Sequence, residues 1–329
     1  MGTTSVDRSG KVGRRGLLGA AAGIGLGLGV PGGSVTAKEG ASRRTGAAGM
    51  TLRWWGNNSW EIRIAVGEGE RTILIDPWLT RFHTRTYAPE GADPRTPISV
   101  DTALIDRYVD SGELRADHIL VTHGHYDHIT DVPYLARRTG ATVMGTETHL
   151  NLMRAMGAPE DQLAIATGGE YLSFDGYSIR ALRSLHSATG PRAQVAFAGT
   201  RPAVPPAEPR VIEDLVEGGT LAFQVSTDDG FSVVNLGGSN YVEAELAGSR
   251  PDIVMIPPGG ASVHKYVRRL LDILDRPRYV IPTHWDDFDY PLDEPARDWG
   301  GLTGLRQAVE AASPRSRFTV LDHLESRTW

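Results

Sequence analysis

The chain has 329 residues, enough for one large α/β domain or two smaller ones, and 40% of them are apolar. It contains no cysteine, which excludes disulfide bonds, thiolate metal ligands and a lipid anchor on cysteine. Acidic residues outnumber basic ones by 40 to 34 and no cluster of lysine or arginine stands out, which disfavours nucleic acid as a partner.

The first 37 residues have the order of a signal peptide. Basic residues, including Arg14 and Arg15, precede a Gly/Ala-rich apolar run that ends at Val30, and small residues follow to Ala37. The arginine pair resembles a twin-arginine export signal, which predicts a secreted protein that leaves the cytoplasm folded and metal-loaded. The apolar run is about 15 residues, shorter than the roughly 20 that span a bilayer, so no stable membrane anchor is expected.

Residues 38–49 lack periodicity and are predicted to form a disordered linker, which leaves residues 50–329 as the folded domain. The predicted signal holds four of the 34 basic residues and one of the 40 acidic ones, so the mature chain has a net charge of about −9. We expect a small-molecule substrate rather than a polyanion, and the sequence leaves the oligomeric state open.

Three antiparallel strands are predicted to open the domain, over residues 51–55, 59–66 and 71–76. They are joined by short turns, as in a β-meander. Asp76 ends the third strand and precedes Pro77, so it is either an active-site carboxylate at a strand end or a turn former. Residues 79–100 are rich in Arg, Thr and Pro and predict a long loop at the edge of a site, before a helix that Asp101 caps.

Four metal-capable side chains then fall within six positions. A strand over 117–121 leads into Thr122-His123-Gly124-His125-Tyr126-Asp127-His128, and apolar residues at helical spacing follow over 129–138. On such a strand-to-helix turn, His123 and His125 point the same way, while Asp127 and His128 serve an adjacent position. Burying these groups without a cation would leave costly unpaired polar atoms. The pattern predicts a metal site, with zinc (Zn2+) preferred and manganese (Mn2+) or iron (Fe2+) as alternatives.

Two further histidines follow predicted strands. His186 comes after a hairpin with strands at 170–174 and 177–182, and His284 comes after a strand at 278–281. The Pro-rich loop 188–219 directly follows His186, and we interpret it as a substrate lid. The other predicted elements are strands at 142–144, 220–226, 232–236, 252–256 and 318–321 and helices at 147–156, 241–246, 262–274 and 296–311.

Together these residues resemble the metallo-β-lactamase-fold hydrolases, specifically the branch typified by ascorbate-phosphate lactonase and related lipid phosphodiesterases. The resemblance covers about residues 51–290. Besides the central motif and His186, it rests on Trp55-Gly56-Asn57-Asn58-Ser59, Ile75-Asp76-Pro77-Trp78, Pro258-Gly259-Gly260 and Pro282-Thr283-His284. It implies an α/β fold of four layers, an αββα sandwich, with two face-to-face sheets, helices outside and metals at one edge.

The resemblance also implies one or two metal ions and their ligands. The first ion would be held by His123, His125 and His186, and the second by Asp127, His128 and His284. Asp76 would stand behind them. The chain departs from the family at Gly238, which falls on the position of a bridging aspartate. The missing carboxylate predicts a weaker second site, and it leaves open a mononuclear enzyme, a hydroxide-bridged dinuclear enzyme and a non-catalytic, degenerate metal-binding protein.

The predicted function is that of an exported metal-dependent hydrolase, in which a metal-activated water attacks a small ester, lactone or related substrate. Asp127 would orient the water or accept its proton. An apolar lid around Phe197 favours an ester or lactone, with a phosphodiesterase as the alternative. His264 is a substitute ligand or a proton donor, or else a solvated histidine at a helix start. Gly238→Asp should raise the metal stoichiometry toward two, with a backbone cost if Gly238 has positive φ.

Overall fold

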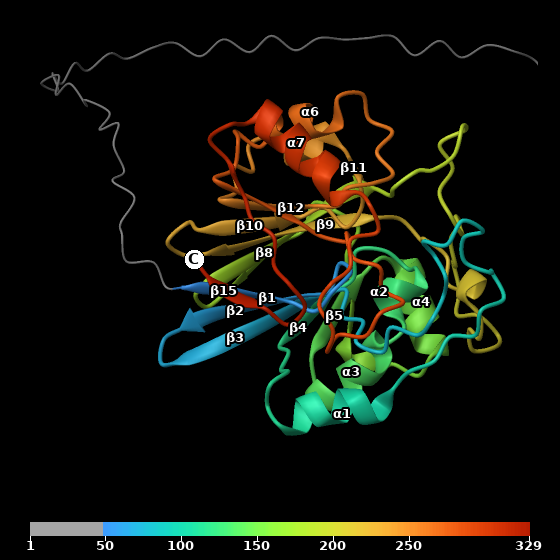
Figure 1. Ribbon diagram of the computed structural model, residues 1–329. Helices are drawn as coiled ribbons and strands as arrows, with labels where there is room; N and C mark the ends of the chain where they lie inside the picture. The colour runs from blue at the N-terminus through green and yellow to red at the C-terminus, as the bar shows by residue number, and fades with distance from the viewer. Residues whose placement is uncertain (1–48) are drawn as a thin grey trace, which may run out of the picture. The chain divides into compact units, whose positions relative to one another are not determined.

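Two β-sheets face each other across a core of alternating apolar residues (Figure 1). The computed structural model describes residues 49–329. In the opening strand β1 (Met50–Trp54), the side chains of Met50, Leu52 and Trp54 are buried and the two between them are half-buried, so one face meets the core. The predicted signal peptide, 1–37, and all but the last residue of the predicted linker, 38–49, lie outside the described residues.

The first sheet has the strand order β15-β1-β2-β3-β4-β5-β6. Its strands are β1 (Met50–Trp54), β2 (Trp60–Val66), β3 (Gly69–Ile75), β4 (His118–Leu120), β5 (Thr142–Gly145), β6 (Leu163–Ile165) and β15 (Ser326–Thr328). The sequence predicts the antiparallel strands β1 to β3 but misses β6 and β15. Both are three-residue edge strands without a buried residue, so they lack the apolar pattern that reveals a strand.

The second sheet has the strand order β11-β8-β9-β10-β12-β13-β14, with β7 paired to β8. Its strands are β7 (Tyr171–Phe174), β8 (Tyr177–Leu185), β9 (Leu221–Thr227), β10 (Ser232–Asn235), β11 (Asn240–Tyr241), β12 (Ile253–Ile256), β13 (Tyr279–Pro282) and β14 (Arg317–Phe318). The parallel strands β10, β12 and β13 are almost entirely buried, as expected of strands covered on both faces. Their carboxyl ends therefore meet at one edge.

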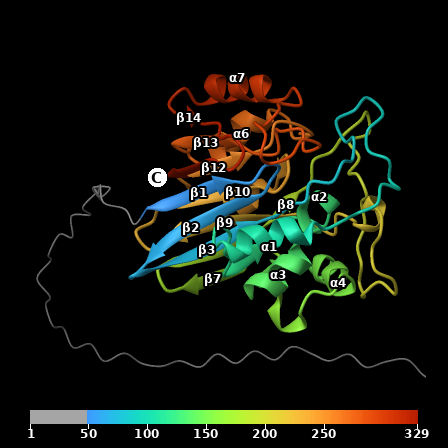
Figure 2. The same cartoon turned by 60° about the horizontal axis from the view of Figure 1, so that its bottom comes forward.

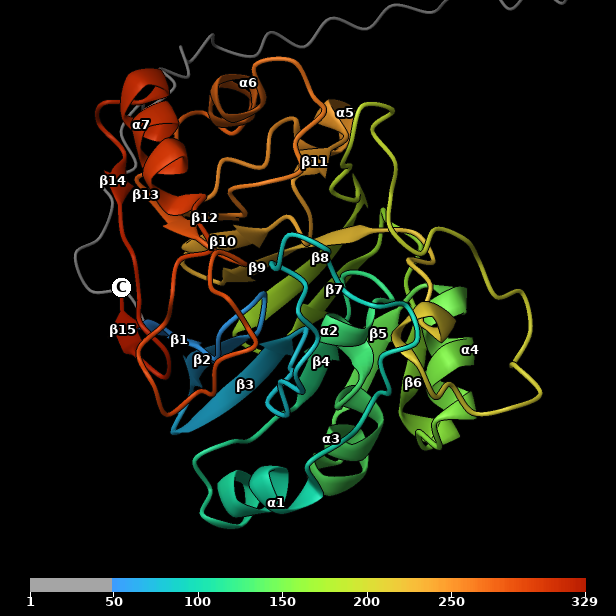
Figure 3. The ribbon, with the colours of Figure 1, turned by 45° about the vertical axis from the view of Figure 1, so that its right-hand side comes forward.

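Helices cover the outer face of each sheet. The first sheet carries α1 (Thr102–Asp110), α2 (Tyr126–Ile129), α3 (Val132–Thr139) and α4 (Glu147–Ala155) (Figure 2), and the second carries α5 (Glu243–Leu246), α6 (Tyr266–Ile273) and α7 (Leu302–Ala312) (Figure 3). Separate apolar clusters lie between the sheets and beneath each set of helices. The predicted four-layer αββα sandwich is confirmed. Within residues 49–329, no helix has the length and apolar character needed to cross a bilayer.

Several helix bounds differ from the prediction. The predicted helix 129–138 is two helices, α2 and α3, and Pro133 occupies the first turn of α3, where its missing N–H costs nothing. The predicted helix 262–274 begins only at Tyr266, because Lys265 before it has a left-handed backbone with φ 53°. The predicted helix 296–311 begins at Leu302, and the predicted helix 241–246 is β11 followed by α5.

Candidate metal centre

Strand ends bring the predicted ligands to one edge of the two sheets. Asp76 follows β3 and the central motif follows β4, and these strands are parallel neighbours with Ile75 opposite Leu120. From the other sheet, His186 follows β8 and His284 follows β13. Groups that follow strands in sheets of this kind collect where ligands bind, at the ends of the strands. The segments that follow β3, β4, β8 and β13 are far apart in the sequence, but the sheet topology brings them together.

The His-Gly-His spacing has a local steric reason. His125 has an extended backbone at the start of α2, and the single turn of α2 carries Asp127 and His128. Between the histidines, the N–H of Gly124 donates to the carbonyl of Glu217 at 2.8 Å. A Cβ atom on Gly124 would lie 2.3 Å from the carbonyl oxygen of Val216. Only glycine lets the loop that ends at residue 219 run this close to the motif.

The first cluster consists of three imidazoles. His123, His125 and His186 each offer a nitrogen, and these atoms lie within 4.8 Å of one another. The Nε2 atoms of His123 and His186 are 3.0 Å apart. Burial, reinforced by repulsion between the rings, lowers the pKa of all three histidines, to about 3 for His125. The rings are therefore neutral at physiological pH, which is the state that binds zinc.

Backbone carbonyls fix which nitrogen of two of these rings carries the proton. His125 Nε2 lies 2.8 Å from the carbonyl oxygen of Ala196, and His186 Nδ1 lies 2.6 Å from that of Ser187. Because a carbonyl only accepts, these nitrogens donate, and the lone pairs remain on His125 Nδ1 and His186 Nε2. The loop 188–219 thus contacts the first cluster through Ala196, and the Phe197 ring stands edge-on to His125 at 5.9 Å.

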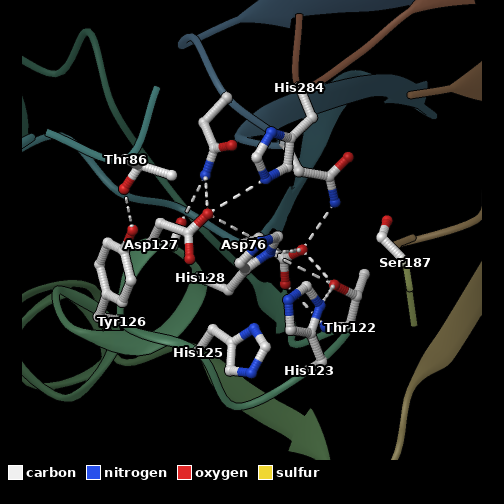
Figure 4. Close-up of polar contacts among 12 residues, drawn as sticks. Asp76, Thr86, Thr122, His123, His125, Tyr126, Asp127, His128, Ser187 and His284 are labelled. Carbon is white, nitrogen blue, oxygen red and sulfur yellow. Dashed lines mark hydrogen bonds and ion pairs between the residues drawn. The ribbon is translucent and has the colours of Figure 1, made fainter. Parts of the chain in front are cut away.

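The second cluster is centred on Asp127. Its Oδ2 atom lies 3.2 Å from His128 Nε2 and 3.1 Å from His284 Nε2 (Figure 4). Burial opposes both charges, yet the carboxylates of Asp127 and Asp76 raise the pKa of His128 to about 10, and the histidines hold the pKa of Asp127 well below its usual range. Asp127 is therefore ionised, and His128 would have to lose a proton to bind a cation.

Asp76 connects the two clusters from behind. Its Oδ2 atom is 2.7 Å from His128 Nδ1, and its Oδ1 atom accepts the backbone N–H of Thr122 at 2.7 Å. The Thr122 hydroxyl and the Asn58 amide also donate to this carboxylate. Asp76 has φ 43°, in the left-handed region that only a few residue types tolerate. Such strain at a buried polar residue is typical of functional sites. The sequence gives no role to Asn58 or Thr122.

An aromatic pair that the sequence does not identify surrounds His284. The Tyr87 hydroxyl lies 3.2 Å from His284 Nδ1, and Trp299 Nε1 donates to the His284 carbonyl at 3.1 Å. The two rings stack, with centroids 5.2 Å apart. They come from the loops after β3 and β13, and Trp299 lies in a segment that the sequence assigns to a helix, 296–311, that in the structure begins only at Leu302. The predicted long loop 79–100 therefore does border the site, through Tyr87.

The structure corrects the prediction for Gly238. Positive φ occurs at its neighbour Gly237, with φ 69°, and not at Gly238. The obstacle is steric instead, because a Cβ atom on Gly238 would lie 2.9 Å from the Leu185 carbonyl oxygen. Asn240, two residues after Gly238, donates to the His186 carbonyl and accepts from Ser262 N.

His264 is not brought into either cluster. It lies exposed in the loop before α6, and among residues 49–329 it belongs to none of the three groups of closely spaced ligand atoms. Those groups are His123, His125 and His186; Asp76, His123 and His128; and Asp127, His128 and His284. The six predicted ligands and Asp76 are thus all gathered at one place, with His264 outside.

The fold and these histidine clusters define the class of metal-dependent hydrolases with a metallo-β-lactamase fold. Over residues 51–284 the chain matches the family described as "Beta-lactamase superfamily domain", and it belongs to the metallo-β-lactamase superfamily. A "UPF0173 metal-dependent hydrolase" of Myxococcus xanthus is 26% identical over 299 residues, covering 88% of this chain and 89% of that protein. Another with the same description, from Pyrobaculum islandicum, is 26% identical over 251 residues, covering 75% and 88%.

Solved structures agree on the fold. Igni18, a metallo hydrolase from Ignicoccus hospitalis, matches with a TM-score of 0.53 and 21% identity, covering 85% of this chain and 98% of that one. The metallo-β-lactamase fold protein YhfI from Bacillus subtilis matches with a TM-score of 0.52 and 11% identity, covering 86% and 100%. The predicted fold is confirmed, and the names of the curated relatives agree with the predicted class of enzyme.

Proposed function

We propose that this protein is an exported, zinc-dependent hydrolase of small esters or lactones, similar to the ascorbate-phosphate-lactonase branch of its superfamily. One observation carries the metal requirement. His123, His125 and His186 are neutral imidazoles at mutual distances that suit one cation, and backbone carbonyls leave a defined lone pair on two of them. The donor set therefore fits zinc, with manganese or iron as alternatives for a second, carboxylate-containing position.

The residues around the clusters have distinct tasks in such a reaction. A bound zinc ion supplies Lewis acidity to the substrate oxygen and lowers the pKa of water to about 7. Asp127 is ionised and buried, so its carboxylate can orient the attacking water and accept its proton. His284 Nε2 faces the same carboxylate oxygen at 3.1 Å and helps to fix its orientation. His264 remains a proposed proton donor that would have to reach the substrate from its exposed loop.

The surroundings of the first cluster support a small organic substrate. Phe197 lies edge-on to His125, and Leu185, directly before His186, leaves 48% of its surface exposed. Apolar side chains beside a polar reaction centre suit the hydrocarbon part of an ester or lactone. The second cluster favours phosphodiester hydrolysis as the other candidate, since paired cations clamp the attacking and leaving oxygens in that reaction.

Metal content and a substrate panel test this proposal together. Purified protein, analysed by inductively coupled plasma mass spectrometry, should contain at least one zinc ion per chain. It should hydrolyse p-nitrophenyl acetate or a γ-lactone faster than bis-p-nitrophenyl phosphate, and EDTA should abolish the activity until zinc is returned. A protein without bound metal, or one whose rate of hydrolysis is unchanged by EDTA, would overturn the proposal. Faster hydrolysis of the phosphodiester would favour the phosphodiesterase alternative. Metal binding without hydrolysis of any substrate would favour a non-catalytic, degenerate metal-binding protein.

A further inference from the structure

Asn57 is a buried residue that ties together two parts of the second cluster. Its backbone is held by the segment that carries His284. The carbonyl of Asn57 accepts the N–H of His284 at 2.8 Å and the hydroxyl of Thr283 at 3.1 Å, and its own N–H donates to Asp286 Oδ1 at 2.8 Å. Asp286 is itself fully buried and paired with Arg81 at 2.8 Å. Asn57 therefore has a fixed position relative to His284.

The side chain of Asn57 reaches the other ligand. Its Nδ2 atom donates to the backbone carbonyl of Asp127 at 2.7 Å and to Asp127 Oδ2 at 3.2 Å. Both partners only accept, so the orientation of the amide is settled by its contacts. In the described part of the chain, the Oδ1 atom of Asn57 is buried without a hydrogen-bond partner. A buried oxygen of this kind costs free energy, so what the residue contributes is the Nδ2 donation to Asp127.

From this geometry we propose that Asn57 is the positioning residue of the second metal subsite, holding the Asp127 carboxylate at a fixed distance from His284. This inference rests on the proposed metal-dependent function. The resemblance described from the sequence implies a bridging carboxylate between the two sites at the position where this chain has Gly238. Asn57 provides another way to fix the second site, because one residue contacts both Asp127 and the backbone of His284. Partners behind the ligands orient them in this way in many metal sites.

The first cluster provides an internal comparison. His123, His125 and His186 lie in a different group of ligand atoms from His284, and the candidate ligands that Asn57 contacts are Asp127 and His284. Loss of the Asn57 amide should therefore lower the affinity for the second ion and leave the affinity for the first ion unchanged. A general loss of folding would lower both affinities.

The backbone of Asn57 allows a clean substitution. Asn57 has φ 48°, a conformation that glycine adopts without strain, so Asn57→Gly deletes the amide and keeps the turn. The matched control is Arg250→Gly, a glycine substitution at another left-handed position, φ 41°, in the loop before β12 and on the protein surface beside Asp275. Metal-free wild-type and variant proteins are titrated with Zn2+ and, separately, with Co2+. Stoichiometry, stepwise affinity, the cobalt absorption spectrum and the melting temperature at each step are recorded.

We expect the wild-type protein to take up two ions in separate steps. Asn57→Gly should weaken the second step by about 10- to 100-fold, the range seen when a partner behind a metal ligand is lost. The first step and its cobalt spectrum should stay unchanged, and Arg250→Gly should match the wild type in both steps.

Equal weakening of both steps, or an unchanged second step in Asn57→Gly, would overturn the role of Asn57. A wild-type protein that binds only one ion would also overturn it while leaving the hydrolase proposal intact. No ion in the wild type would remove the proposed function itself. If Asn57→Gly fails to fold, Asn57→Ala and Asn57→Ser are titrated instead, with the same criteria.

Discussion

The Nε2 atoms of His123 and His186 lie 3.0 Å apart although 63 residues separate them in the chain. Burial keeps both rings neutral, so neither nitrogen repels a cation, and within residues 49–329 the group of ligand atoms that contains both histidines is completed by His125. The pair joins the two sheets, since one histidine follows β4 and the other follows β8.

Removing either histidine of this pair should empty the first site. His123→Ala and His186→Ala each leave two protein ligands, and sites with three protein ligands rarely retain zinc after such a loss. We expect most of the metal to disappear in mass spectrometric analysis of both variants. His83→Ala is the matched control, because that side chain is 70% exposed and lies outside the clusters. Full metal retention in both variants would contradict the assignment of the first site.

An aspartate at position 238 should not restore a bridging ligand. The Cβ atom would lie 2.9 Å from the Leu185 carbonyl oxygen and 3.2 Å from His186 Cα, so the strand that carries a ligand must shift. Overpacking of this kind costs about 1–3 kcal/mol. We therefore expect Gly238→Asp to lower the free energy of unfolding and to bind no more metal than the wild type, in contrast to the expectation from the sequence. A tighter second binding step than in the wild type, in a stable variant, would show that the strand yields.

The buried ion pair of Arg81 and Asp286 should matter more for stability than any exposed pair. The two side chains are 1% and 0% exposed and lie 2.8 Å apart, with His323 on the same carboxylate oxygen. Asp286→Ala leaves a buried guanidinium without its partner and should cost about 3–5 kcal/mol in urea unfolding of the metal-free protein. Adding Arg81→Met should recover part of the loss.

An exposed ion pair serves as the control for that measurement. Arg297 and Glu294 are about half exposed and 2.8 Å apart, so Arg297→Met should change the free energy of unfolding by less than about 1 kcal/mol. Equal effects of Asp286→Ala and Arg297→Met would show that water reaches the Arg81 site.

We propose that the protein is exported by the twin-arginine route and that this export requires Arg14 and Arg15. The double variant Arg14→Lys, Arg15→Lys keeps the charge and should leave the precursor inside the cell, which immunoblots of cell and medium fractions would measure. Arg43→Lys, Arg44→Lys, a second arginine pair outside the predicted signal, should be secreted normally. Unchanged secretion of the first variant would mean that its arginine pair is incidental.

The sequence predicts the opening strands and the central motif from short-range signals, whereas the four layers and the grouping of the ligands follow from the family resemblance. Met50, Leu52 and Trp54 alternate toward the core, and the motif from His123 to His128 concentrates its ligands in one turn. Edge elements such as β15 leave no such signal, since Ser326–Thr328 is exposed throughout. The start of α6 is displaced by the backbone of Lys265, which depends on tertiary packing.

The residues that position the ligands are harder to find. Asn57 and Tyr87 are polar residues in loops, and only the folded chain shows that one reaches Asp127 and the other reaches His284. Positive φ at Asn57, Asp76 and His284 would have marked the site, but neighbouring side chains impose that conformation. Gly238 is the reverse case. The sequence shows that this residue is a glycine, but it does not show the close approach of Leu185 that constrains the position.

The pairing of β1 with β15 has a consequence for the order of events during synthesis. The hydroxyls of Thr51 and Thr328 meet at 2.8 Å, although the two residues are 277 positions apart in the chain. When β1 leaves the ribosome it can pair with β2, but its other edge stays open until the distant partner has been made. Contacts of such high sequence separation form late and slowly. The growing chain therefore exposes the open edge of β1 for most of its translation. During that time the edge is a binding site for a chaperone.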